Sequence, residues 1–191
     1  MPTKKSLNQN NELALNSDDL PNYISPFPAG TRISQVFGER PAFYGPLGFL
    51  GHPGIDYAVV YSTLVRACQW GLVLEIGNQP KGWGKYIKIQ HGNLFSIYAH
   101  LSQVLVTADC YVTRGEIIAR SGNSGLSSGP HTHFGLNDPT KYNNGYKGYI
   151  NPNLMLDPGF DTMSIKLKKI KAEIAQIAKD KYDSKSLYIH V

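Results

Sequence analysis

Between residues 33 and 136 the chain is a succession of short β-forming segments, and this pattern limits the fold more than any other feature. The segments are rich in Ile, Val, Leu and Tyr and are separated by glycine-bearing turns. They are LVRA, GLVLEI, KYIKIQ, LFSIYAH, QVLVT, EIIARS and HTHFGL. Short strands with frequent turns are typical of all-β domains. We therefore expect an all-β fold, an antiparallel sandwich or a barrel-like domain.

Three regions of the 191-residue chain differ in composition, and the length suits a single domain with its own core. Residues 1–22 are polar, rich in asparagine and without a pattern, which predicts a flexible N-terminal arm. Residues 23–158 hold the β-forming segments and are expected to form the domain. Residues 159–191 begin at a Pro-Gly break, which predicts a separate tail.

A helical pattern is absent from residues 33–136 and present in the tail. Apolar residues recur there at spacings of four and three, as on one face of an amphipathic helix. They are Met163, Leu167, Ile170, Ile174 and Ile177. We expect a short C-terminal amphipathic helix that packs on its own domain or on a partner. We favour a partner at residues 163–180, either a second copy of the chain or a virion component.

Charge, hydropathy and cysteine spacing narrow the class of protein. The net charge is +5, which favours polyanionic partners without choosing among them.

The first 20 residues lack the run of roughly seven apolar residues that a signal peptide needs. No segment approaches the ~18 apolar residues of a membrane span. We expect neither Sec export nor a transmembrane segment. Cys68 and Cys110 lie far apart without a CxxC spacing, so the sequence leaves open whether they pair, and we expect buried free thiols.

The first motif with chemical meaning is GHPGIDYAVV, in which three residues separate His52 from Asp56. Pro53 and Gly54 argue against a helix, so we expect a loop that runs into a strand beginning near Ile55. The imidazole then lies on the loop and the carboxylate on the strand.

The second motif is SGPHTHFG, which places two histidines one residue apart. Side chains alternate along a strand, so His131 and His133 should point to one face and Thr132 to the other. A third motif, YAHL, puts His100 at the end of another strand. Each motif alone is weak, because a lone histidine on a strand is more often packed or at the surface.

Together, His52, Asp56 and His133 would provide one carboxylate and two imidazoles. Zinc bound by three protein ligands, with a fourth position open to water, is typical of catalytic sites rather than structural ones.

The motifs HPGID, YAHL and GNSGLSSGPHTHFG stand in an order and spacing that resemble the lysostaphin-like zinc endopeptidases of peptidase family M23. The likeness runs from ISQVFGER at residues 33–40 to INPNLML at residues 150–156. It also includes TLVRACQWGLVLEIG, which is similar to a pair of strands of that family. It covers about two thirds of the chain, more than a motif match does.

The resemblance implies the family's β fold, a duplicated hybrid motif, with one Zn²⁺ held by His52, Asp56 and His133. It implies that His131 and His100 are the catalytic pair beside the metal. One neutral imidazole could take a proton from the attacking water, and the other could stabilise the oxyanion or protonate the leaving amine. The sequence does not assign these two roles between the two histidines.

Other positions in the motifs carry weaker expectations. Gly135 stands where the family usually has glutamate. That glutamate is not a metal ligand, so its absence puts in doubt a contact to one of the ligands but not the binding of the metal. Tyr44, in the loop before His52, and Asn123, in the loop SGNSG, are our candidates for substrate-binding residues, although an aromatic residue in such a loop more often packs. We expect His91 to be structural.

The resemblance favours a zinc endopeptidase that cuts peptidoglycan peptides at the bacterial cell wall, in the periplasm or outside the cell. The partner is then peptidoglycan rather than nucleic acid. One alternative is a family member that has lost catalysis and serves as a binding, regulatory or virion structural module; the complete set of five residues argues against it. A histidine phosphocarrier would leave Asp56 without a role. Without a signal peptide, delivery as a bacteriophage lysin or in a virion is one setting, and a bacterial protein with another export route is the other.

Overall fold

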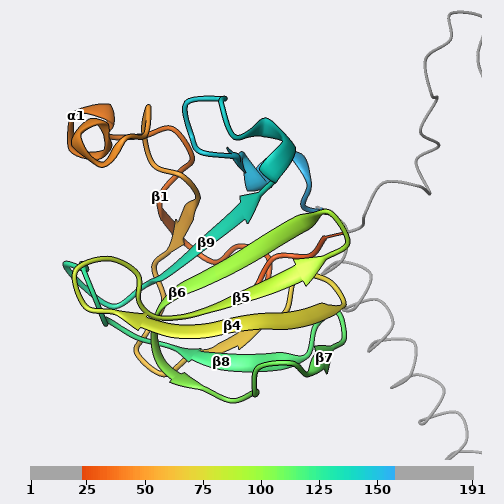
Figure 1. The fold of residues 1–191 in the computed structure, drawn as a ribbon. Helices are drawn as coiled ribbons and strands as arrows, with labels where there is room; N and C mark the ends of the chain where they lie inside the picture. Colours follow the sequence, from red (N-terminus) through yellow and green to blue (C-terminus); the bar gives the residue numbers. More distant parts are fainter. Residues whose placement is uncertain (1–22, 158–191) are drawn as a thin grey trace, which may run out of the picture.

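A computed structural model describes residues 23–157 as an antiparallel β-domain (Figure 1). All strand pairings are antiparallel. In chain order the strands are β1 (Ile33–Gln35), β2 (Ile55–Tyr57), β3 (Leu64–Arg66), β4 (Gly71–Gln79), β5 (Gly84–His91), β6 (Leu94–Val104), β7 (Tyr111–Val112), β8 (Ile117–Ser121), β9 (Thr132–Asn137) and β10 (Tyr149–Ile150). The expected all-β antiparallel class is confirmed.

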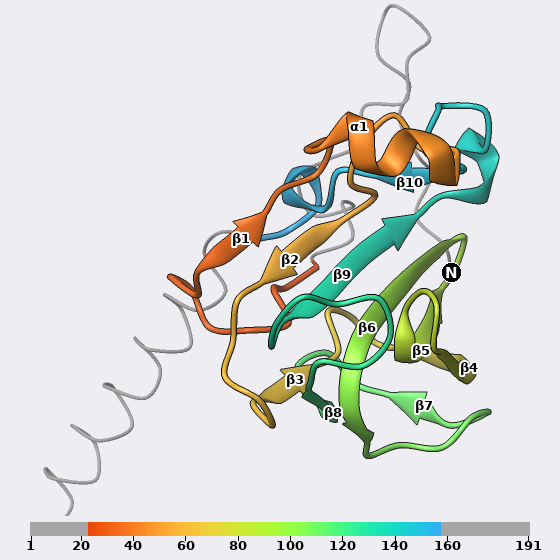
Figure 2. The same ribbon diagram turned by 90° about the vertical axis from the view of Figure 1, so that its left-hand side faces the viewer.

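The strands form one sheet with the order β1-β2-β9-β6-β5-β4-β7. Strand β10 pairs with β9, while β8 pairs with β6 and carries β3 on its other edge. Strand β6 is therefore central, because it pairs with β5, β8 and β9. The sheet bends at this strand, and Figure 2 shows β3, β7 and β8 lying beneath the longer strands.

The core lies on both faces of β6, because its side chains alternate as far as Ala99, and the irregular backbone at His100 then turns Leu101 to the same side as Tyr98. Tyr98 and Leu101 belong to the larger cluster, which also contains Phe134 from β9. Ile97 and Ala99 belong to a smaller cluster on the other face, covered by partly buried aromatic residues. Those aromatic residues are Phe37, Phe49, Trp83, Phe95 and Tyr146. A strand that is buried on both faces holds its residues firmly, and His100 lies within this strand rather than at its end.

Two local expectations were wrong. QVLVT is not a separate strand, because β6 continues through His100 to Val104 after a register shift next to Leu101. The segment before His52, expected as a loop, contains two helical turns: α1 (Pro41–Tyr44) and the 3-10 helix Gly45–Leu47. Both are too short to leave a helical period in the sequence. Two further 3-10 helices span Pro139–Lys141 and Pro152–Leu154.

The N-terminal arm, residues 1–22, and the tail from residue 158, with its expected helix, lie outside the described residues. Within residues 23–157, no helix has the length and apolar character needed to cross a membrane. Cys68 and Cys110 are both free thiols, as expected, although only Cys68 is fully buried.

Candidate metal centre

The three candidate metal ligands come from one loop and two paired strands. Strands β2 and β9 are neighbours in a register that puts Asp56 directly opposite His133. His52 precedes β2 in a loop held by two backbone hydrogen bonds, from His52 N to Glu39 O (2.8 Å) and from Gly38 N to His52 O (2.9 Å). The expected placement of His52 on a loop and Asp56 on a strand is confirmed.

Gly54 allows this loop to approach His133. A Cβ atom at this position would lie 2.6 Å from Cε1 of the His133 ring and 2.5 Å from the carbonyl oxygen of Phe134. No side chain tolerates such contacts, so the glycine of the HPGID motif is required by packing.

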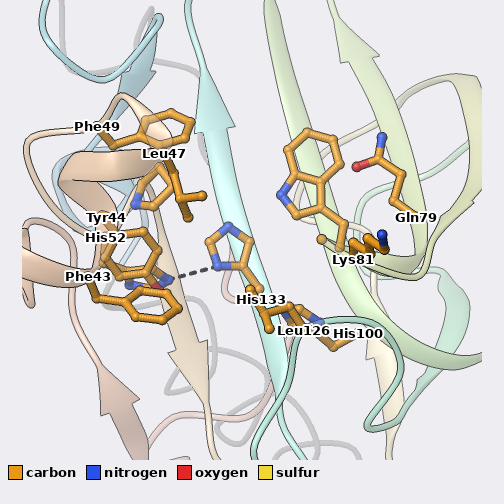
Figure 3. Close-up of a pocket in the computed structure, with 13 residues that line it drawn as sticks. Phe43, Tyr44, Leu47, Phe49, His52, Gln79, Lys81, His100, Leu126 and His133 are labelled. Carbon is orange, nitrogen blue, oxygen red and sulfur yellow. Dashed lines mark hydrogen bonds between the residues drawn. The ribbon is translucent and has the colours of Figure 1, made fainter.

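The ligand atoms form a nearly equilateral triangle. His52 Nε2 lies 2.9 Å from His133 Nδ1, the contact that is dashed in Figure 3. His133 Nδ1 lies 3.0 Å from Asp56 Oδ1, and Asp56 Oδ1 lies 3.1 Å from His52 Nε2. Tetrahedral zinc with bonds of 2.0–2.1 Å separates its ligand atoms by about 3.3 Å. All three residues are buried, with exposed fractions of 1%, 4% and 8% for His52, His133 and Asp56.

The hydrogen bonds of His52 show that this triangle suits a cation. A carbonyl oxygen only accepts, so His52 Nδ1 must donate to the carbonyl of Val36, 3.2 Å away. Neutral His52 then presents the lone pair of Nε2 to Asp56 Oδ1, which also only accepts. A single N–H of His133 cannot donate to both His52 Nε2 and Asp56 Oδ1. A metal ion, by contrast, accepts a lone pair from all three ligand atoms at once. The residues therefore fit zinc.

The protonation states of the ligands favour the same conclusion. Burial opposes ionisation of Asp56, but its close contacts with His133 and His52 outweigh this effect and hold the pKa of its carboxyl well below the usual range. Burial lowers the pKa of His133, against the opposing effect of Asp56. A charged carboxylate and neutral imidazoles are the forms that bind metal.

His131 and His100 lie side by side next to the triangle, with ring centroids 4.5 Å apart. His131 Nε2 is 3.9 Å from Asp56 Oδ2, so the first and second histidines of the HTH motif share one face, as alternation predicted. Thr132 between them is buried. His100 has a positive φ of 61°, a conformation that non-glycine residues adopt rarely and that is enriched at functional sites.

Both histidines are held in one tautomer by the backbone. His131 Nδ1 donates to Gly129 O and His100 Nδ1 donates to Ser124 O, each at 2.8 Å. The neutral rings therefore keep an Nε2 lone pair that can accept a proton. Burial, together with the neighbouring His131 and His133, lowers the pKa of His100 to about 4, so this ring is neutral at pH 7.

Gly135 leaves the far side of one ligand without a partner. A Cβ atom there would lie 3.4 Å from His133 Nε2 and 2.9 Å from the ring of Tyr149. Tyr149 thus lies in the space that a side chain at position 135 would enter. Among residues 23–157, His133 Nε2 is buried without a hydrogen-bond partner, in keeping with the doubt that Gly135 raised.

The two candidate substrate-binding residues lie in different surroundings. Tyr44 packs on the ring of His52, with centroids 5.2 Å apart, and its hydroxyl accepts a hydrogen bond from Gln35. Burial and the charge of Asp56 raise its pKa. Asn123 is exposed, and its Oδ1 accepts from Ser127 Oγ, which lies 3.1 Å from His131 Nδ1. It therefore contacts the site only through Ser127.

Two cavities meet over the candidate ligands, of about 320 Å³ and about 310 Å³. Five residues line both of them and make them one groove: Phe43, Tyr44, His100, Leu126 and His133. The larger arm has an apolar wall that was not predicted from the sequence. Leu47 and Phe49 form part of it (Figure 3), and Trp83 also lines this arm. The sequence signal for this wall is the run AFYGPLGFL, which has five large apolar or aromatic side chains around two glycines.

Comparisons with known proteins agree with this geometry. The family model described as "Peptidase family M23" matches residues 50–151. The chain is 36% identical over 124 residues to "Peptidoglycan DD-endopeptidase ShyA" of Vibrio cholerae, covering 63% of this chain and 29% of that protein. It is 38% identical over 97 residues to lysostaphin of Staphylococcus simulans, covering 48% of this chain and 20% of that protein. The chain thus spans less than a third of the length of these curated relatives.

A solved structure supports the fold. The catalytic domain of the prophage-encoded M23 protein EnpA from Enterococcus faecalis superposes with a TM-score of 0.57 and 29% sequence identity. The match covers 69% of this chain and 95% of that domain. The overlap is therefore close to a complete catalytic domain of that protein.

Proposed function

The chain belongs to peptidase family M23, and from this premise we propose that it is a zinc-dependent endopeptidase that hydrolyses peptide bonds in peptidoglycan stem peptides or cross-bridges. One observation carries the proposal: Nε2 of His52, Oδ1 of Asp56 and Nδ1 of His133 converge within 3.1 Å, beside two further histidines. The printed names of the relatives, which include a peptidoglycan DD-endopeptidase, support the substrate class.

The chain's own residues would divide the chemistry as follows. His52, Asp56 and His133 would hold the zinc, which when bound supplies a Lewis acid that activates water and polarises a carbonyl. The Nε2 lone pair of one of the two histidines, His131 or His100, would accept the proton of the attacking water, and the same ring, now protonated, would donate that proton to the leaving amine. The hydrogen bonds to Gly129 O and Ser124 O keep both rings oriented for this transfer.

The substrate would lie in the groove above these residues. A cleft lined by apolar side chains, with the polar atoms at its floor, suits an extended peptide. Tyr44 would contact the substrate because it lines both arms, and Asn123 would act by holding Ser127 beside His131.

The test is digestion of purified peptidoglycan by the full chain, with mass analysis of the released fragments. We expect about one zinc per chain, new amino and carboxyl termini at peptide bonds, and no cleavage after zinc is removed by a chelator. Zinc binding without any new termini, on wall material from several cross-bridge types, would contradict an enzyme and favour the alternative of a binding, regulatory or virion structural module.

We also propose that the protein acts at the bacterial cell wall, in the periplasm or outside the cell, and that it is encoded by a bacteriophage. The likeness to the catalytic domain of a prophage-encoded M23 protein supports the phage setting. Residues 163–180 remain our candidate for self-association or for contact with a virion component. Truncation after Pro158 tests this part: we expect an unchanged melting temperature and activity on soluble peptides, with loss of assembly in light scattering. An unchanged mass with a lower melting temperature would contradict it.

A further inference from the structure

The groove contains an uneven distribution of charge. Apart from the histidines, only three of the described residues that line its two arms carry a full charge: Arg40, Lys81 and Asp56. Asp56 is committed to the candidate metal centre. The two remaining charges are both positive, and both side chains are exposed.

The two cations lie in different arms. Arg40 lines the arm that contains His131, Ser127 and Ser128, whereas Lys81 lines the arm that contains Trp83. The residues common to both arms, among them His100 and His133, lie between them. A peptide laid along the groove therefore passes one cation on each side of the candidate metal centre.

The loops that carry the cations are held in place by the fold. Arg40 precedes α1, and its guanidinium lies 5.1 Å from the centroid of the Phe43 ring, a cation–π contact that keeps it beside the groove. Lys81 lies in the turn between β4 and β5, which is tied to the loop after β8 by hydrogen bonds from Leu126 N to Gly82 O and from Lys85 N to Ser124 Oγ. Figure 3 shows Lys81 across the cavity from Phe43 and Tyr44.

Among the described residues, neither cation forms an ion pair. Within residues 23–157, no carboxylate lies within ion-pair distance of Arg40 or Lys81, whereas Lys141 lies 3.7 Å from Asp138. Zinc with the carboxylate of Asp56 would add a net positive charge at the floor of the groove. With zinc bound, the full charges that line the groove would sum to a positive value, which would attract anionic peptides.

We propose that Arg40 and Lys81 bind carboxylates of the substrate on opposite sides of the scissile bond, so that the enzyme selects acidic stem peptides over neutral bridges such as oligoglycine. This inference rests on the proposed function and names its substrate class. The apolar side chains Phe43 and Leu126, which are 44% and 55% exposed, would contact the aliphatic parts of the same peptide. A neutral bridge would leave both cations without partners.

The test compares two synthetic cross-linked stem-peptide dimers, one with free carboxylates and one with the same carboxylates amidated. For the zinc-loaded wild type we expect a kcat/KM that is higher for the acidic dimer, by roughly 3- to 10-fold for each cation that makes a contact. Arg40→Gln and Lys81→Gln should each lower kcat/KM for the acidic dimer by one such factor, mainly through a higher KM. Neither substitution should change kcat/KM for the amidated dimer. The difference should shrink as salt is added, because the contacts are exposed.

Matched controls remove the same charge outside the groove. Arg32→Gln and Lys88→Gln change residues that line neither arm, and both should keep the preference of the wild type. Equal kcat/KM for the two dimers in the wild type, or an equal loss of preference in the controls, would overturn the proposal.

A binding measurement separates this inference from the proposed function. Trp83 lines the same arm as Lys81, so its fluorescence reports occupancy; Trp70→Phe removes the signal of the other tryptophan. With dimers that are N-methylated at the scissile amide, tighter binding of the acidic form, lost in Lys81→Gln, supports the inference even if no bond is cut. Hydrolysis of both native dimers with equal binding overturns the inference alone.

Discussion

The domain contains two clusters built around histidine, four histidines at the groove and His91 with its core partners elsewhere, and they differ in how the ring nitrogens are used. At the groove, Nδ1 of His52, His100 and His131 each donates to a backbone carbonyl, and Nε2 is left for the site. On the other side of the core, His91 has both nitrogens engaged: Nδ1 donates to Trp70 O at 2.6 Å, and Nε2 accepts from Ser96 Oγ at 2.7 Å.

Burial alone does not distinguish the two clusters, because His91 and His100 are both 8% exposed. The difference lies in what remains after the fold has satisfied its own hydrogen bonds. Within residues 23–157, the contacts of His91 also include the Sγ of Cys68 at 3.7 Å and the ring of Tyr23, both in the core. A histidine with both nitrogens satisfied inside the fold is structural, whereas one with a directed lone pair is available for metal or proton transfer.

Removing a candidate metal ligand should have the largest effect and tests this comparison most directly. His52→Ala, Asp56→Ala and His133→Ala should each abolish stoichiometric zinc and reduce hydrolysis by more than the ~10- to 100-fold expected for loss of an outer partner. Elemental analysis of the purified variants measures the zinc. The control is His91→Ala, which should retain it. Full zinc content in all three ligand variants would show that the ligands have been assigned wrongly.

Replacing either of the two histidines beside the candidate metal centre should have a smaller effect. His131→Ala and His100→Ala should retain zinc and fold, while the rate of hydrolysis falls by about 10²- to 10⁴-fold, because each loses a group that transfers protons. Single-turnover kinetics on a soluble peptide measure the chemical step. A variant that cleaves at the wild-type rate would remove that histidine from the catalytic pair.

The opposite result is expected for the structural histidine. His91→Ala should lower the free energy of unfolding by roughly 2–4 kcal/mol, because it opens a cavity and leaves Ser96 and the carbonyl of Trp70 without their partner. Zinc content and the rate for each folded molecule should stay at wild-type values. Denaturant unfolding measures the free energy of unfolding. A lower rate of hydrolysis for each folded molecule of this variant would contradict a purely structural role for His91.

The smallest expected effect is on the pH dependence of stability. Burial lowers the pKa of His91, despite its hydrogen bond to Trp70 O. The unfolded chain therefore gains a proton first as the pH falls, so the stabilisation is complete above the ordinary histidine pKa of about 6.5 and declines below it. Unfolding of the wild type and of His91→Gln should be compared between pH 7.5 and 5. The wild type should lose more stability; parallel curves would contradict a depressed pKa.

Much of the fold could be predicted because its signals are local. Alternating apolar residues and glycine turns located β3 to β6, β8 and β9. The strands that escaped prediction are short and at the edges, β1, β7 and β10, with two or three residues each. The continuation of β6 through His100 could not be foreseen, because it depends on pairing with β8 rather than on the segment itself.

For the candidate site, the sequence by itself determined the set of residues and part of their geometry. Spacing placed His52 on a loop and Asp56 on a strand, and strand alternation put His131 and His133 on one face, because side chains of a strand repeat every two residues. These relations are local and follow from the chain alone.

Only the tertiary structure decided how these residues meet. Asp56 and His133 are 77 positions apart, and the register of β2 with β9 brings them within 3.0 Å. The carbonyls that select each histidine tautomer, and the placing of Arg40 and Lys81 in separate arms of the groove, likewise come from segments distant in sequence. No local pattern contains such contacts, because they exist only once the sheet has paired and its loops have closed over one end.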